Sequence, residues 1–396
     1  MSDKITANAS SGRRVLVCVS GMSPAIVTET LYALVTQQQD APFVPDEIHV
    51  ITTVDGKEKI VRELLAAESG MFHRFMRDHL PELPATAVRF DESTVHVISQ
   101  TAKAGKAGKA LSDITTDDDN RAAADTIYSV LRKLKSVPNT RLHASVAGGR
   151  KSMSFYMGHA FSLVAEAGDR LSHVLVNEPF ENPALKFYFP PRQGQSYRWQ
   201  ERDGTERSAH SDQAVIRLAE LSVLRLGGLL AEGLPPKALN NFDFTVQLAQ
   251  AAIQAPPVRV VWEKEEGRLE ILGEVIKLQP QQFLVFALYA MACKHQTELP
   301  NGAALIRNDV HKSDLLEQML DQKTISAITF KSTRSKIQQA ITQTLGRAVA
   351  RHFQIEAVGI RQTNQERPTM LHLPPDTITL VGMDAWWPKL RAALRG

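Results

Sequence analysis

Hydrophobic positions in the first half of the chain form short apolar runs, each followed by a longer segment with helical spacing of its apolar residues. The runs are continuous rather than alternating, which is typical of strands in a parallel sheet covered on both faces. Repeated strand-then-helix units predict an α/β fold, a Rossmann-like doubly wound parallel sheet. The expected strands lie near residues 14–19, 46–56, 142–147 and 173–180, within a domain of residues 1–192.

The pattern changes after this domain. Residues 193–213 are polar and predict a linker, and the apolar residues that follow predict helices, giving a linker-and-helix region over 193–256. From residue 257 short alternating strands turn at Glu266 and Gly267, and helices and a terminal hairpin follow. Strands, three helices and a hairpin predict a winged-helix-like domain over 257–396. The three helices are expected near 280–295, 313–320 and 326–346, and the hairpin at 370–381.

The first turn of the sheet domain carries two hydroxyls. Ser20, Gly21, Met22 and Ser23 follow the first strand, and Pro24 is expected as the first helical residue, where its missing N–H costs nothing. The turn matches neither the dinucleotide-binding nor the P-loop pattern. Serine hydroxyls above a helix N-terminus would hold a phosphate or orient a ribose. The alternative is that Ser23 only caps the helix.

A second turn carries two cations. Gly148 and Gly149 follow the strand at 142–147 and allow a close approach of the backbone to a ligand, and Arg150 and Lys151 begin the next helix. Cations beside the unpaired N–H groups of a helix N-terminus form an anion site in outline. The alternative is a turn with two solvated cations. Both turns end strands of one parallel sheet, so we expect them to face one crevice and to bind a phosphorylated ligand.

Composition excludes several classes of protein. The chain has 396 residues and a net charge of +3, too small to imply a polyanionic partner by itself. Cys18 and Cys293 form no metal-binding cluster, which indicates a reducing compartment. No apolar run approaches the roughly 20 residues of a membrane span, and the polar start is no signal peptide. We expect a cytoplasmic protein that does not enter a membrane.

Residues 101–120 alternate Lys, Ala and Gly and then become acidic. This composition predicts a mobile loop that buries no core and precedes a helix starting after Asn120. A long insertion above strand ends is often a lid or a binding loop. Asp113, Asp117 and Asp118 are candidate metal ligands, or else a solvated charge run.

Three segments in this order resemble a known family: SGMSPAIVTETLYAL, SDITTDDDN and SVAGGRKSM. They resemble CARF (CRISPR-associated Rossmann fold) proteins, and more closely the CARF proteins with a C-terminal winged helix that include ring nucleases of type III CRISPR systems. The resemblance implies a homodimer that binds cyclic oligoadenylate, in particular cyclic tetra-adenylate, across its two-fold axis. Some such domains only sense the ligand, whereas ring nucleases also cleave it.

Cleavage needs no metal or other cofactor, because the ligand carries its own nucleophile, the ribose 2′-OH, beside each phosphodiester. The products would be linear oligoadenylates that end in a 2′,3′-cyclic phosphate. By analogy with the family, the catalytic residues are Ser20 or Ser23 together with Lys151, and Arg150 is the second choice for stabilising charge. The other residues expected to contact the ligand are Gly21, Met22, Pro24, Thr28, Asp113, Gly148, Gly149, Ser152 and Met153.

A second class of function stays open. The same ligand would be sensed without cleavage by a transcription regulator that reads DNA through its winged helix, with Lys331, Arg334 and Lys336 as candidate phosphate contacts. The winged helix would alternatively serve only for dimerisation. An effector nuclease is a third class, but we find no convincing effector active site in the sequence. Met22 and Phe155 are weak candidates for stacking on adenine.

Overall fold

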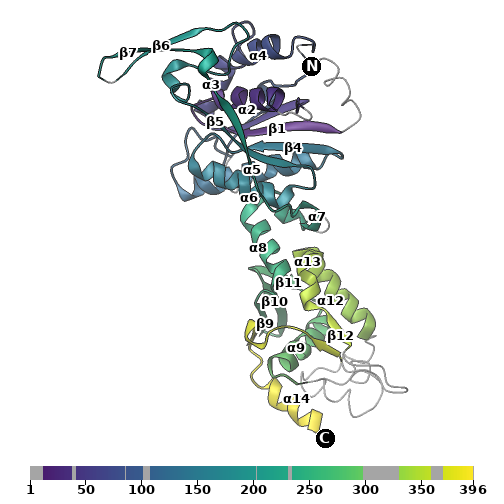
Figure 1. The fold of residues 1–396 in the computed structure, drawn as a ribbon. Coiled ribbons are helices and arrows are strands. Elements are labelled where there is room, and N and C mark those ends of the chain that lie inside the picture. Colours follow the sequence, from purple (N-terminus) through teal and green to yellow (C-terminus); the bar gives the residue numbers. More distant parts are fainter. Residues whose placement is uncertain are drawn as a thin grey trace. The chain divides into compact units, whose positions relative to one another are not determined.

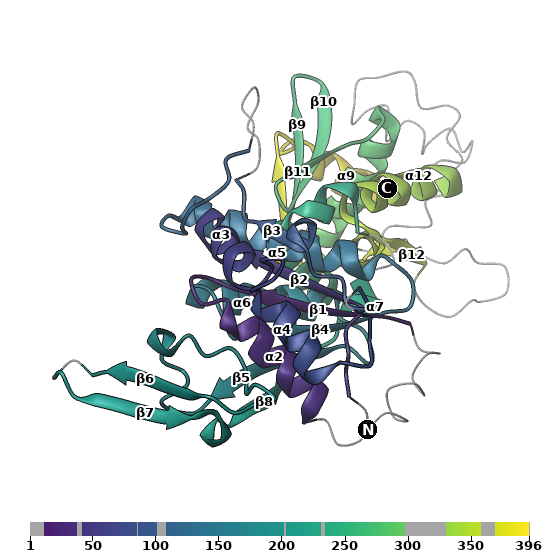
Figure 2. The same ribbon diagram turned by 90° about the horizontal axis from the view of Figure 1, so that it is seen from above.

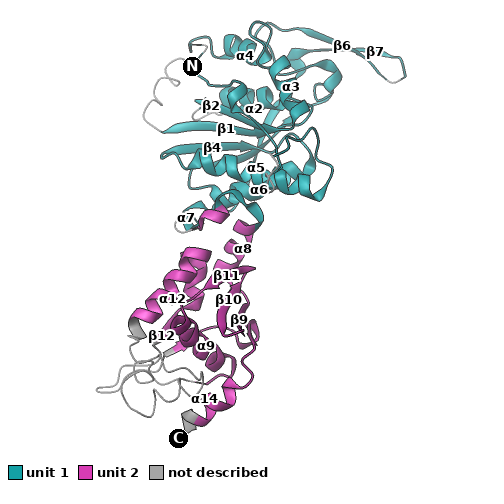
Figure 3. Cartoon of the chain, turned by 180° about the vertical axis from the view of Figure 1, so that it is seen from behind, with its two compact units in different colours: residues 1–231, 239–243 teal, residues 232–238, 244–396 magenta. Residues whose placement is uncertain are grey.

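A computed structural model describes residues 12–37, 42–84, 86–100, 108–201, 203–230, 234–297, 330–357 and 369–395 (Figure 1). The chain divides into two compact units. Unit 1 holds residues 1–231 and 239–243, and unit 2 holds residues 232–238 and 244–396 (Figure 3).

Unit 1 is built around a six-stranded sheet in the order β3-β2-β1-β4-β5-β8. The first five strands in this order are parallel, as the continuous apolar runs predict, and β8 pairs antiparallel with β5. The predicted α/β fold with a largely parallel sheet is therefore confirmed. The strands are β1 (Arg13–Val19), β2 (Glu47–Thr52), β3 (Val95–Val97), β4 (Thr140–Ser145), β5 (Arg170–Val176) and β8 (Ile216–Leu221).

Helices supply apolar side chains to the sheet. One core combines buried residues of β1 and β2 with those of α2 (Ala25–Thr36), α3 (Val54–Glu63) and α4 (Met71–His79). The helices α5 (Asp117–Lys135) and α6 (Lys151–Val164) pack on each other and on β4. Both faces of the central strands are thus covered, which explains why β1 is buried along most of its length.

The strand order contains a reversal. From β1 the chain adds β2 and then β3 on one side, and it later crosses to β4 and β5 on the other side. The central neighbours β1 and β4 run in register as far as Cys18 opposite Ser145. Their carboxyl ends form the topological switch point, where ligands bind in open α/β sheets.

The predicted linker and helix after residue 192 are wrong for residues 193–226. β6 (Ser196–Gln200) and β7 (Glu206–His210) form an antiparallel hairpin that extends away from the sheet (Figure 2). The next segment is the edge strand β8, followed by the short helix α7 (Gly227–Leu230). Tertiary packing overrides helix propensity here, because Ile216 packs into the core beneath the hairpin.

The prediction that residues 101–120 bury nothing is wrong for the part that the structure describes, residues 108–120. The Leu111 N–H donates to the Ile98 carbonyl oxygen, and the side chains of Leu111 and Ile114 are buried. α5 begins at Asp117 rather than after Asn120, because Thr116 caps it in a capping box with Asp119. Residues 101–107 lie outside the described residues. Short 3-10 turns complete unit 1 at η1 (Glu92–Thr94), η2 (Pro183–Leu185) and η3 (Ser211–Gln213).

Unit 2 contains a sheet in the order β11-β10-β9-β14. Its first hairpin turns at Lys264 and Glu265, two residues before the predicted Glu266 and Gly267. The apolar helix predicted at 280–295 is confirmed as α9 (Pro280–Lys294), which is buried around most of its circumference. The strands are β9 (Val258–Glu263), β10 (Glu266–Ile271), β11 (Glu274–Lys277), β12 (Ile355–Ala357), β13 (Thr369–Leu371) and β14 (Ile378–Val381).

The predicted terminal hairpin at 370–381 is wrong. β13 pairs antiparallel with β12, whereas β14 pairs in parallel with β9, so the two halves of the expected hairpin join different sheets. The helix predicted at 313–320 lies outside the described residues. The other helices are α8 (Phe242–Ile253), α12 (Phe330–Leu345), α13 (Arg347–Ala350) and α14 (Trp386–Arg395), with 3-10 turns at η4 (Pro236–Asn240), η5 (Arg351–Phe353) and η6 (Pro375–Thr377). Across the described ranges, no helix has the length and apolarity needed to cross a membrane.

Candidate functional site

The turns after β1 and β4 meet at the switch point. A Cβ added to Gly21 would lie 3.2 Å from the Cα of Gly149, and one added to Gly148 would lie 2.6 Å from the carbonyl oxygen of Val19. Side chains at these positions would push the turns apart. The glycines are therefore needed for the contact, and the predicted convergence of the two turns is confirmed.

A third glycine, Gly56, was not predicted and also packs closely against the first turn. A Cβ on Gly56, in the first turn of α3, would lie 3.1 Å from the carbonyl oxygen of Gly21. Gly21 is thus held between Gly56 and Gly149. The sequence offers little signal for this contact, because Gly56 lies in an ordinary amphipathic helix.

The backbone conformation of the second turn sets the position of its two cations. Gly149 has φ +80°, a left-handed conformation that places Arg150 and Lys151 at the start of α6. The hydroxyl of Ser154 donates to the carbonyl oxygen of Val146 at 2.8 Å and fixes the turn from below. No side chain caps α6. Its first N–H groups and the positive end of its dipole therefore favour an anion.

The two serines of the first turn differ in exposure. Ser20 is 0% exposed, and its hydroxyl contacts the carbonyl oxygens of Gly21 and Ser23 at 3.5 and 3.3 Å. Ser23 is exposed, and its hydroxyl has no hydrogen-bond partner in the described part of the chain. α2 begins at Ala25, so Pro24 lies one residue before the helix and not at its first position as predicted. No side chain caps α2, so the alternative that Ser23 is a helix cap is wrong.

The two cations also differ. The guanidinium of Arg150 contacts both carboxylate oxygens of Asp113, with Nε 3.0 Å from Oδ1. This hydrogen bonding holds the pKa of the Asp113 carboxyl below its usual range. Lys151 is exposed and has no ion-pair partner among the described residues. Lys151 therefore remains the available cation, while the ion pair ties Arg150 to the segment that carries Asp113.

Other predicted contact residues support the turns from inside. The Thr28 hydroxyl is buried and lies within hydrogen-bond distance of the carbonyl oxygens of Ala25 and Tyr188, at 2.9 and 3.0 Å. Met153 is buried, with its sulfur beneath Gly149, and Ser152 is partly exposed. The structure describes no group of three His, Cys, Asp or Glu side chains arranged to hold a metal ion.

A cavity of about 90 Å³ lies beside the first turn and is lined by Met22 and Ser23. The ammonium of Lys59 donates to the carbonyl oxygen of Met22 at 2.5 Å. Glu29 lines the same cavity and is buried. Glu29 was not predicted, although the one acidic residue in an otherwise uncharged helix is a signal that the sequence offers.

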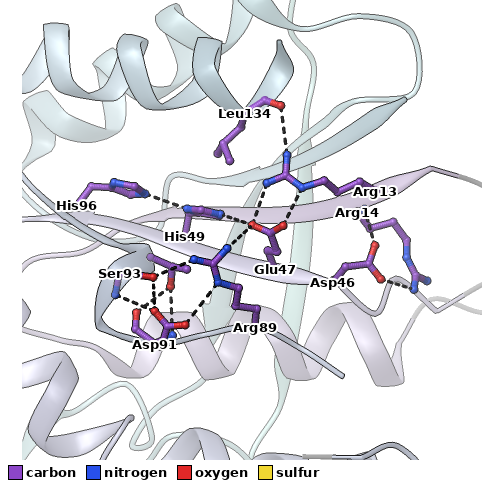
Figure 4. Close-up of polar contacts among 11 residues, drawn as sticks. Arg13, Arg14, Asp46, Glu47, His49, Arg89, Asp91, Ser93, His96 and Leu134 are labelled. Atoms are coloured by element: carbon purple, nitrogen blue, oxygen red, sulfur yellow. Dashed lines mark hydrogen bonds and ion pairs between the residues drawn. The ribbon is translucent and has the colours of Figure 1, made fainter. Parts of the chain in front are cut away.

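A separate polar network lies toward the opposite end of the sheet (Figure 4). The guanidinium of Arg13 holds Glu47 through two hydrogen bonds of 2.8 Å, and Glu47 contacts His49 Nε2 at 2.9 Å. His49 Nδ1 in turn lies 2.9 Å from His96 Nε2. Arg13 and Glu47 are the first residues of β1 and β2, so they lie at the opposite end of these strands from the switch point.

A family model described as CRISPR-associated protein NE0113 matches residues 23–254. The match covers more than half of the chain; it begins at Ser23, the last residue of the first turn, and includes the whole second turn. The chain belongs to this CRISPR-associated family. Comparison with curated proteins gives no match.

Two solved structures are similar to this family member over much of its length. One is described as Enterococcus italicus Csm6 bound to cyclic hexa-2′-fluoro-hexa-dAMP, with 11% identity, coverage of 78% of this chain and 61% of that chain, and a TM-score of 0.28. The other is a type III CRISPR defence DNA nuclease activated by cyclic oligoadenylate, with 14% identity, coverage of 85% and 34%, and a TM-score of 0.22. The chain thus spans less than two thirds of either structure. Its assignment rests on the family match.

Proposed function

We propose that the crevice above β1 and β4 binds a cyclic oligoadenylate and cleaves it, so that the protein is a ring nuclease that ends type III CRISPR signalling. One observation carries this proposal. Ser23 and Lys151, a hydroxyl and an ammonium without partners among the described residues, follow neighbouring parallel strands whose turns touch at Gly21 and Gly149. The CRISPR-associated family and the sequence resemblance support the choice of ligand.

The residues of the crevice suit attack by the ligand's own 2′-OH. Hydrogen bonding from Ser23 and the charge of Lys151 would hold one phosphodiester with its 2′-oxygen in line, and orientation alone is worth several kcal/mol. As the O2′–P bond forms and the P–O5′ bond breaks, Lys151 stabilises the charge on the phosphoryl oxygens. The proton lost from O2′ balances the proton gained by O5′. The chain end left behind is a 2′,3′-cyclic phosphate.

A homodimer would match the symmetry of a cyclic tetra-adenylate, because a two-fold axis places two copies of each turn around one ring. Met22 is 58% exposed in the first turn, and Phe155 is 65% exposed one helical turn after Lys151. These apolar side chains stand beside the proposed anion site. They are available to the ligand's bases or to the second protomer.

The alternative is a regulator that binds the same ligand without cleavage and reads DNA through unit 2. It is favoured by α12, which carries Arg334 and an exposed Lys336 and precedes the β12–β13 strand pair in the chain. The side chain of Lys331 lies outside the described residues. In this alternative unit 2 acts as a winged helix, and phosphate contacts set its affinity for DNA.

Incubation with cyclic tetra-adenylate in excess EDTA, followed by chromatography, tests the proposal. The expected result is linear product with a 2′,3′-cyclic phosphate end. Lys151→Ala should lose product formation while calorimetry still detects the ligand, and Lys133→Ala, a change at an exposed lysine on α5, should behave as wild type. Intact ligand that stays bound to the wild type would overturn cleavage and favour the regulator. If the protein binds neither cyclic tetra-adenylate nor cyclic hexa-adenylate, the proposal that its ligand is a cyclic oligoadenylate is overturned.

A further inference from the structure

Glu29 is an unusual residue in its helix. It is the only charged residue of α2, and it is 7% exposed between fully buried Val27 and Leu31. Its carboxyl oxygens make no hydrogen bond or ion pair with any residue that the structure describes. A carboxyl that is largely withdrawn from water and has no partner among the described residues is free to bind a group that enters beside it.

The carboxyl of Glu29 faces a cavity that continues from the candidate site. The cavity volume of about 90 Å³ has room for several water molecules, since one water needs roughly 10–15 Å³. Ser23 lines the same cavity, so a ligand whose phosphate lies at the turn can extend a neighbouring group toward Glu29. Pro183, Phe187 and Tyr188 provide apolar and aromatic walls.

The other charged groups around this cavity differ from Glu29. Lys59 already donates to the Met22 carbonyl oxygen, and Glu63 accepts a hydrogen bond of 2.7 Å from the Tyr188 hydroxyl. Glu181 and Lys186 complete the titratable lining on the segment after β5. Burial raises the pKa of Glu29 to about 8, so the carboxyl is largely neutral at pH 7.

We propose that this cavity is the subsite for an adenine base of the ligand, and that the carboxyl of Glu29 reads the edge of that base. A protonated carboxyl offers one O–H donor next to one acceptor oxygen. Adenine offers the complement, because its N6 amino donor lies next to an acceptor ring nitrogen, N1 or N7. The inference rests on the proposed function and adds the residue that recognises the base.

Ionisation of Glu29 would remove the donor and turn a carboxylate oxygen toward the acceptor nitrogen of adenine. Binding therefore weakens as the pH rises through the range in which Glu29 ionises. A glutamine side chain keeps a donor and an acceptor at the same positions and does not titrate, and glutamine is a known partner for two atoms of adenine. A methionine side chain keeps the volume but removes both groups.

Calorimetric titration of the full-length protein with cyclic tetra-adenylate at pH 6.5 and pH 9 tests the subsite. Wild-type affinity should fall several-fold between these values, Glu29→Gln should bind equally at both, and Glu29→Met should bind about tenfold more weakly at pH 6.5. Thermal unfolding accompanies each titration. Glu29→Met should be at least as stable as wild type, because it removes an unpaired buried carboxyl.

Three results would overturn the inference. Equal affinity in all three proteins would remove the subsite and leave the proposed function standing. A loss of stability together with a loss of binding in both variants would make Glu29 a structural residue. Failure of the wild type itself to bind any cyclic oligoadenylate would overturn the subsite and the proposed function together.

Discussion

Gly21 and Gly149 touch backbone to backbone, since a Cβ on Gly21 would lie only 3.2 Å from the Cα of Gly149. This contact joins the turn that carries the free hydroxyl of Ser23 to the turn that carries Lys151. The residues lie more than a hundred positions apart in the sequence, and parallel pairing of β1 with β4 brings them together.

We expect Gly149→Ala to disrupt the crevice. The residue has φ +80°, and an added Cβ would lie 2.8 Å from the sulfur of Met153. Stability should fall by about 1–3 kcal/mol, the usual cost of this conformation for a residue other than glycine. Binding of cyclic tetra-adenylate, measured by calorimetry, should fall at least about tenfold because the second turn and the uncapped N–H groups at the start of α6 are displaced together.

Gly168→Ala is the matched control for this change. Gly168 has φ +93° with open space around its Cβ position, so it has a similar backbone cost and lies outside the crevice. Its variant should lose stability without losing affinity. Equal affinity in both alanine variants would show that the geometry of the second turn does not matter for binding.

Ser23→Ala should affect mainly cleavage, whereas Ser20→Ala should affect mainly stability. The exposed hydroxyl of Ser23 contributes nothing to packing, so its removal should change the unfolding free energy by less than about 0.5 kcal/mol while slowing cleavage. The buried hydroxyl of Ser20 bonds within the turn, so its removal should cost about 0.5–1.5 kcal/mol. Urea unfolding and product chromatography measure the two effects. If the Ser20→Ala protein is fully stable but loses cleavage, while the Ser23→Ala protein keeps it, then Ser20 and not Ser23 is the serine that acts in cleavage.

The network in Figure 4 should make stability depend on pH. Burial lowers the pKa of His49, and burial with the charge of His49 lowers that of His96 to about 4. Arg13 holds Glu47 as a carboxylate, so His49 donates from Nε2 to Glu47 and accepts at Nδ1 from His96. A proton added to His49 Nδ1 would set its N–H against the N–H of His96.

The sign of this effect follows from proton uptake. An unfolded histidine titrates near pH 6.5, so between pH 6.5 and 4 the unfolded chain binds more protons than the folded one. The unfolding free energy should therefore fall as the pH falls through this window, by at most about 1.4 kcal/mol per pH unit for each histidine. Further loss is expected below about pH 4, where Glu47, with a folded pKa of about 2, begins to protonate in the unfolded chain.

His96→Gln should reduce this dependence, because glutamine can donate to His49 Nδ1 without titrating. Urea unfolding at pH 7 and pH 5 measures the change. His73→Gln, on α4 and away from the network, is the control and should keep the wild-type dependence. A His96→Gln protein that loses as much stability as wild type between pH 7 and pH 5 would exclude His96 as a source of the effect.

The sequence was informative where a local pattern decides the local structure. Continuous apolar runs predict the buried strands β1, β2 and β4, and the glycine and serine turns mark their carboxyl ends. The parallel sheet then requires these ends to share one edge. The meeting of the turns that carry Ser23 and Lys151 was therefore predictable, although the pairing of Arg150 with Asp113 was not.

The misread segments depend on distant partners. Residues 216–221 have a sequence compatible with a helix, and they form β8 because β5 offers a free edge and the core beneath the hairpin receives Ile216. Likewise, β13 and β14 are close in sequence but pair with β12 and β9. Local propensity differs by little between helix and strand in such segments, and burial against a distant element is the larger energy.

The sequence by itself determined the α/β class, the two turns at strand ends and the residue types that suit a phosphate. The tertiary structure alone decided which of these residues are available: it buries Ser20, pairs Arg150, leaves Ser23 and Lys151 exposed, and turns Glu29 toward a cavity. The physical reason is that residue identity and spacing set local conformation, whereas exposure and partners depend on groups that only the folded chain brings within a few ångströms.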